Sequence, residues 1–79
     1  MVAEDLHHWL RQKIGQELSQ EPSSVDLDCQ FDDLDLDSLS VVTLAYDLET
    51  YTGLNIDPTV FSEFKTPNEL SRWILSQKG

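Results

Sequence analysis

The sequence predicts an all-α protein, a small four-helix bundle with three longer helices and one short helix. Three observations support this prediction. Apolar residues recur at spacings of three and four residues in three separate segments, as they do on one face of a helix. Proline and glycine stand where those segments begin or end, and no segment alternates between apolar and polar residues as a strand would. A chain of 79 residues makes one domain with a small core.

The first helix is expected from about Ala3 to Ser19. Its apolar residues share one stripe: Leu6, Trp9, Leu10, Ile14 and Leu18. His7 and His8 lie beside this stripe and are expected at the surface. Adjacent side chains on a helix diverge, so the two imidazoles are poorly placed to share a metal ion.

A long connection follows the first helix, from the break at Pro22 to Asp37. Loops of this length in a compact domain are usually functional or held by anchors. Phe31 and Leu34 are expected to be the anchors. Cys29 has no second cysteine to pair with, so it is interpreted as a small packing residue, and nothing requires an oxidising compartment.

The second helix is expected from Ser38 to about Tyr51, with Gly53 as its left-handed terminator. Four of its apolar residues are spaced to face the core: Val41, Leu44, Ala45 and Leu48. Three more lie on a neighbouring face, with Thr43 and Glu49 beside them: Leu39, Val42 and Tyr46. A helix with apolar residues over more than half of its circumference is deeply buried or meets a partner. In so small a domain we favour the partner surface.

Two further helices complete the prediction. Asp57 is expected to cap a short helix from Pro58 to Phe64, which places Val60, Phe61 and Phe64 inward. The segment Thr66-Pro67-Asn68-Glu69 has the pattern of a capping box with proline in the first turn. The last helix then carries three apolar residues on its inner side: Leu70, Trp73 and Ile74.

The charge of the chain limits its partners. Fifteen acidic residues face five basic ones, and the span 14–64 holds twelve of the acidic residues and no basic residue. Such a surface repels nucleic acids and anionic membranes and attracts basic proteins. There is no signal-peptide pattern and no apolar run of the ~18 residues that a membrane span needs. The chain is therefore expected to be cytoplasmic and, as an isolated domain, monomeric.

Ser38 has two interpretations. A serine in the first turn of a helix is commonly an N-cap, because its oxygen accepts a backbone N–H. No histidine or lysine stands near it in sequence to make it a nucleophile, and the chain lacks a Gly-rich phosphate loop and a Cys/His cluster. The aspartates of the connection lack the order of a calcium loop. The sequence therefore does not predict an enzyme or a resident metal.

The chain resembles the acyl carrier protein family over about residues 5–76. The motifs that carry the resemblance are Phe31-x-x-Leu34-x-x-Asp37-Ser38-Leu39-x-x-Val42-x-Leu44, Leu48-Glu49, Thr52-Gly53-Leu54, Pro58-Thr59 with Phe61, and Thr66-Pro67 with Leu70. The later motifs are most similar to carrier domains of modular polyketide synthases. Peptidyl carriers of nonribosomal synthetases often have His before the serine, so Asp37 favours an acyl carrier.

The resemblance implies that Ser38, flanked by Asp37 and Leu39, receives a 4′-phosphopantetheine arm from coenzyme A through a separate phosphopantetheinyl transferase. The arm then carries acyl intermediates as thioesters to ketosynthase, acyltransferase and other synthase domains. Partner enzymes are expected to contact Asp35, Leu39, Val42, Thr43, Tyr46 and Glu49. An acyl chain is expected to be sheltered by Phe31, Val41, Leu44, Leu48, Val60 and Phe61.

One departure from the family pattern is Asp35, which stands where the family usually has Gly. Glycine permits a left-handed backbone, and Asp tolerates that geometry better than most residues. Three alternatives to an acyl carrier stay open: an unmodified acidic interaction module, a peptidyl carrier domain, and a calcium-binding helical protein.

Overall fold

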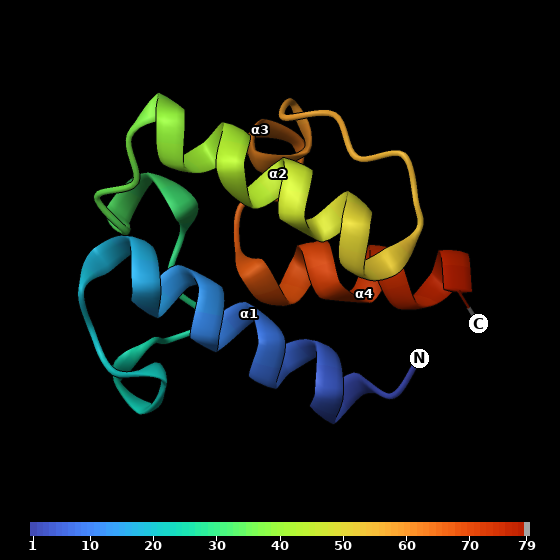
Figure 1. The fold of residues 1–79 in the computed structure, drawn as a ribbon, viewed down its shortest axis with the longest axis horizontal. Coiled ribbons are helices and arrows are strands. Elements are labelled where there is room, and N and C mark those ends of the chain that lie inside the picture. The colour runs from blue at the N-terminus through green and yellow to red at the C-terminus, as the bar shows by residue number, and fades with distance from the viewer. Residues whose placement is uncertain (79) are drawn as a thin grey trace.

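The structure is a computed structural model that describes residues 1–78, and it is all-α, as predicted (Figure 1). The part of the chain described contains four α-helices and two single turns of 3₁₀ helix: α1 (Ala3–Leu18), η1 (Pro22–Ser24), η2 (Phe31–Asp33), α2 (Ser38–Thr52), α3 (Val60–Glu63) and α4 (Pro67–Lys78). Three helices are long and one is a single turn. None of these helices has both the length and the apolarity needed to cross a membrane.

The helices run back and forth, so that the end of α1 lies on the same side of the molecule as the start of α2 (Figure 1). A hydrogen bond joins these two ends: Ser40 Oγ donates to Glu17 Oε2 at 2.9 Å. α1 also packs against α4 and against η1. The amino end of α2 is therefore held between the connection and the last turn of α1.

The core draws on every long helix and on the connection between α1 and α2. Its buried apolar members are Leu6, Leu10, Ile14, Val25, Leu27, Phe31, Leu34, Leu44, Ala45, Leu48, Ile56, Val60, Leu70 and Ile74. The two predicted anchors, Phe31 and Leu34, are confirmed, and Val25 and Leu27 are two further anchors. Backbone bonds also fix the connection, since Phe31 N–H donates to the Lys65 carbonyl at 2.8 Å. A loop held in this way can present the residues that follow it in a fixed geometry.

α1 begins and ends almost where its apolar stripe predicts. It stops one residue early, at Leu18, because Ser19 adopts a left-handed backbone with φ of 56°. The prediction that both histidines lie at the surface is wrong for His7. This side chain is partly buried, and its Nε2 lies 3.2 Å from the Ser71 hydroxyl of α4, whereas His8 is exposed.

α2 matches its predicted span to within one residue, and Gly53 ends it with φ of 75°. Leu44, Ala45 and Leu48 are buried as predicted. The prediction that Val41 faces the core is wrong, because this residue is only partly buried and lies outside the core cluster. The position is close to the exposed start of the helix, where no neighbouring element covers it completely.

α3 is shorter than predicted, because Pro58 and Thr59 form a turn before the helix begins at Val60. Val60 is buried, and Phe61 and Phe64 pack partly buried against the core.

The capping box before α4 is confirmed in altered form. Thr66 Oγ1 accepts the N–H of Glu69 at 3.1 Å, while the Glu69 carboxylate accepts the N–H of Lys65 at 2.9 Å. The Glu69 carboxylate thus bonds to the residue before the N-cap, and it still satisfies a backbone donor next to the helix start.

Candidate functional site

Ser38 is the first residue of α2, and its side chain is exposed. The N-cap is Asp37, whose carboxylate Oδ1 accepts the N–H of Ser40 at 2.7 Å. The interpretation of Ser38 as the cap of its helix is therefore wrong. Because Asp37 accepts the N–H of Ser40, the hydroxyl of Ser38 is not needed for capping, and Ser38 lies exposed at the helix start.

The chain reaches Ser38 through a left-handed residue. Asp35 has φ of 52°, one of two positive-φ residues other than glycine among residues 1–78. Glycine, the family's usual residue here, adopts this geometry without strain, and Asp35 adopts it in this chain. Asp35 thus keeps the turn that leads the connection into α2.

The conformation of Asp35 predicts a specific order of stabilities. A left-handed backbone costs a residue with an ordinary Cβ about 1–2 kcal/mol, while Asp pays less and Gly pays none. Asp35→Ala should therefore lower the unfolding free energy by about 1 kcal/mol, which urea denaturation measures as a lower midpoint than that of the wild type. Asp35→Gly should stay close to the wild type, because relief of strain offsets the greater freedom of glycine in the unfolded chain. Equal stability of the Ala and Gly variants would contradict the strain argument.

The electrostatics of the helix start also depend on Asp37. The hydrogen bond from the N–H of Ser40 holds the pKa of the Asp37 carboxyl below its ordinary value. α2 has no acidic residue in its own first turn. Asp37 therefore supplies the negative charge that stabilises the positive end of the helix. The carboxylate is therefore ionised and already bonded at neutral pH.

This shift predicts how stability changes with pH. A carboxyl whose pKa is lowered by folding stabilises the native state above its unfolded pKa, about 3.9. That contribution is lost as the pH falls through the lower pKa of the folded state. Asp37→Ala should therefore lower the thermal midpoint at pH 7, and the gap from the wild type should narrow in acid, below about pH 4. Thermal melts of both proteins at neutral and acid pH measure this difference between their midpoints. A difference that stays the same in acid would exclude the Asp37 carboxylate as its cause.

The predicted partner face of α2 is exposed. Leu39, Val42 and Tyr46 have exposed fractions of 73%, 51% and 71%, although each is a large apolar or aromatic residue. Thr43 is also exposed. Glu49 is partly buried, and its Oε1 accepts the N–H of Ile56 at 2.8 Å, so this carboxylate also fixes the loop after α2.

The six residues predicted to shelter an acyl chain do not all come together. Phe31, Leu44, Leu48 and Val60 belong to the core cluster, and Phe61 packs against it, whereas Val41 stands apart. The rings of Phe31 and Phe61 meet edge to face, with centroids 4.9 Å apart. Both residues line a surface pocket of about 240 Å³.

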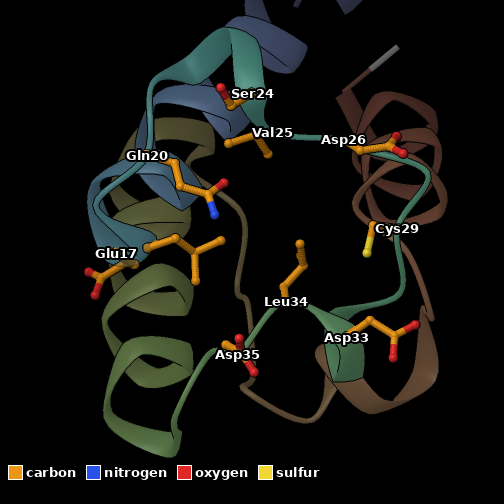
Figure 2. A pocket seen from close by; sticks show the side chains of 10 residues that line it. Glu17, Gln20, Ser24, Val25, Asp26, Cys29, Asp33, Leu34 and Asp35 are labelled. Carbon is orange, nitrogen blue, oxygen red and sulfur yellow. The ribbon is translucent and has the colours of Figure 1, made fainter.

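Sequence reasoning missed a larger pocket beside the approach to Ser38. It measures about 420 Å³ and is lined by Glu17, Leu18, Gln20, Ser24, Val25, Asp26, Cys29, Asp33, Leu34 and Asp35. Figure 2 shows Leu34 and Cys29 directed toward the hollow, with Glu17 and Asp35 on the side nearest α2. No sequence pattern indicates it, because it forms only where the connection folds against the end of α1.

Within residues 1–78, no three His, Cys, Asp or Glu side chains are grouped as a metal site.

Comparison with known proteins identifies the family of this chain. The family described as "Phosphopantetheine attachment site" matches residues 8–74. The chain is 31% identical over 77 residues to acyl carrier protein TtuC of Teredinibacter turnerae, covering 98% of this chain and 88% of that protein. It is 38% identical over 56 residues to mycoketide-CoA synthase of Mycobacterium tuberculosis, covering 71% of this chain and 1% of the synthase.

A solved structure gives the same fold. A free-standing peptidyl carrier protein from an uncharacterised secondary metabolic pathway of Acinetobacter baumannii superposes with a TM-score of 0.90. The two sequences are 27% identical, and the alignment covers 98% of this chain and 96% of the other.

Proposed function

Because this chain belongs to the phosphopantetheine-attachment family of carrier domains, whose members are not themselves catalysts, we propose that Ser38 is the residue that carries the 4′-phosphopantetheine arm. The single observation that supports Ser38 most strongly is its exposed hydroxyl at the first residue of α2, beside a cap made by Asp37. Three of the other serine side chains are bonded or buried. Ser40 donates to Glu17, Ser71 is buried, and Ser76 donates to the Trp73 carbonyl.

The residues around Ser38 fit a phosphodiester. The start of a helix carries backbone N–H groups without intrahelical partners and a partial positive charge, and both favour an anion. Asp37 opposes a second negative charge, since its carboxylate stays ionised while it accepts the N–H of Ser40 in the same turn. When attached, the arm supplies a terminal thiol that holds an acyl group as a thioester.

Loading requires chemistry that this chain does not supply. In the transfer, the Ser38 oxygen forms a bond to the phosphorus of the pantetheine phosphate in coenzyme A, and the bond from that phosphorus to adenosine 3′,5′-bisphosphate breaks. The serine proton passes to a base that the transferase supplies, because no histidine or lysine of this chain stands near Ser38 in sequence. The role of the chain is to present an accessible, correctly oriented hydroxyl.

The exposed face of α2 supports a proposal for the partners. Leu39, Val42 and Tyr46 offer apolar contacts, and the acidic surface around them attracts enzymes that carry basic patches, such as the transferase, ketosynthase and acyltransferase. Contacts of this kind weaken with salt, which suits a domain that must leave each enzyme in turn.

Intact mass spectrometry tests the proposal directly. The chain is incubated with coenzyme A and a promiscuous phosphopantetheinyl transferase, beside an established carrier protein as positive control. We expect the mass to rise by one phosphopantetheinyl group. An unchanged mass, under conditions that convert the control completely, would refute the proposal and favour an unmodified interaction module.

The nature of the cargo is a second question. Asp37 and the similarity to TtuC favour an acyl group, whereas the close superposition on a peptidyl carrier protein favours an aminoacyl group. The loaded chain can be offered to a polyketide acyltransferase with its acyl-coenzyme A and to an adenylation domain with its amino acid. We expect acylation by the first, and aminoacylation alone would assign a peptidyl carrier.

A further inference from the structure

We infer that Glu17 and Ser40 are positioning residues for the loading of Ser38, an inference that rests on the proposed function of Ser38. Ser40 lies two residues after Ser38, in the same first turn of α2. Glu17 lies in the last turn of α1. The bond between them, 2.9 Å from Ser40 Oγ to Glu17 Oε2, spans 23 positions of sequence and joins the two helices at the attachment site.

Ser40 is held from two directions. Its backbone N–H donates to Asp37 within the turn at 2.7 Å, and its hydroxyl donates to Glu17 across the helix interface at 2.9 Å. The first bond sets the shape of the turn. The second sets where that turn lies relative to α1, because a hydroxyl has a single proton to give and gives it to Glu17.

The first turn of a helix is its least constrained part, because its N–H groups have no partners from a preceding turn. The direction of the Ser38 hydroxyl follows from the orientation of this turn. A small displacement of the reacting oxygen from the phosphorus slows the reaction, even where the affinity of the carrier for the transferase is unchanged. The bond from Ser40 to Glu17 therefore affects the rate of transfer more than the affinity of the carrier for the transferase.

A different role for Glu17 gives different predictions. As an exposed carboxylate it could instead be a contact for a basic patch on the transferase. In that case neutralising Glu17 would raise KM, and removing the Ser40 hydroxyl would have no effect. Under the positioning role, both residues matter equally, and the charge of Glu17 matters less than its capacity to accept a hydrogen bond.

The experiment compares variants that break the bond with variants that keep it. Ser40→Ala and Glu17→Ala break it, whereas Ser40→Thr keeps a hydroxyl and Glu17→Gln keeps an acceptor oxygen without charge. Glu21→Ala is the charge-matched control, because Glu21 is an exposed acidic residue just beyond α1. Transferase kinetics with varied carrier concentration give kcat and KM, and circular dichroism melts confirm that each variant is folded at the assay temperature.

We expect Ser40→Ala and Glu17→Ala each to lower kcat roughly two- to tenfold, the range of one net hydrogen bond, with KM nearly unchanged. The double variant should be no slower than either single variant. Ser40→Thr, Glu17→Gln and Glu21→Ala should stay near the wild type. Hydrogen exchange gives a reading independent of the transferase: the Val41 amide, which donates to the Asp37 carbonyl at 3.0 Å, should exchange faster in both alanine variants.

Three results would overturn the inference. The first is wild-type kcat in both alanine variants, the second is a rise in KM confined to the Glu17 variants, and the third is an equal loss in Ser40→Ala and Ser40→Thr. Each leaves Ser38 as the attachment residue, because the wild-type chain is still loaded. A wild-type chain that takes up no arm would instead refute the proposed function and this inference together.

Discussion

Replacing Ser38 with alanine is expected to abolish phosphopantetheine loading completely. The hydroxyl oxygen is the atom that forms the new bond to phosphorus, so no residual rate is expected from neighbouring groups. Ser38 is exposed and Asp37 makes the helix cap, so the fold should be retained, with a change in unfolding free energy within about 0.5 kcal/mol. Intact mass after prolonged incubation with transferase and coenzyme A measures the effect.

Two serine variants serve as controls for this result. Ser62→Ala removes an exposed hydroxyl on α3 and should load like the wild type. Ser40→Ala should load slowly but reach complete modification, because it alters the rate and leaves the acceptor oxygen in place. A loaded Ser38→Ala chain would show that the arm is attached to another residue.

The largest loss of stability is expected from shortening Leu48 on the inner side of α2. Leu48 is 1% exposed and belongs to the core cluster. Leu48→Ala should lower the unfolding free energy by about 2–5 kcal/mol, through lost apolar burial and the cavity left behind. The total unfolding free energy of a native domain is only about 5–15 kcal/mol, so the variant loses a large share of its stability and should unfold at a clearly lower urea concentration than the wild type.

Leu39→Ala is the matched control, because it makes the same chemical change on the opposite side of the same helix. Leu39 is 73% exposed, so its truncation should change stability by less than about 0.5 kcal/mol. Urea denaturation of both variants gives the comparison. Similar losses in the two variants would mean that the two faces of α2 are wrongly assigned. Leu39→Ala should instead weaken binding to partner enzymes, since its side chain belongs to the proposed partner face.

Local patterns were sufficient for the long helices, with the ends of α1 and α2 predicted to within one residue, but not for the bounds of the short helix α3. The stripe that begins at Leu6 predicts α1, and Gly53 and Thr66 mark helix boundaries that the structure confirms. Each of these signals involves residues within one or two turns of each other. The exposed face of α2 was predictable for the same reason, because helical spacing alone separates Leu39 from Leu48.

Two predictions at the start of α2 are wrong, because elements outside the helix decide them. Both Asp37 and Ser38 are good capping residues, and sequence alone does not decide which of them takes the extended backbone of a cap. The left-handed turn at Asp35 and the anchored connection decide it in favour of Asp37. Val41 has core spacing, yet it lies near the start of the helix, where the elements that would cover it do not reach.

The sequence by itself determined the helical class, the ends of α1 and α2 to within one residue, the acidic character and the serine at the start of α2. Only the tertiary structure decided that this serine is freed from capping, that Glu17 is bonded to Ser40, and that a pocket opens beside Asp35. The physical reason is range. Periodicity and capping act between neighbours in sequence, whereas the bond from Ser40 to Glu17 joins residues 23 positions apart, and the contact of His7 with Ser71 joins residues 64 apart. Such contacts exist only after the helices have packed around their shared core.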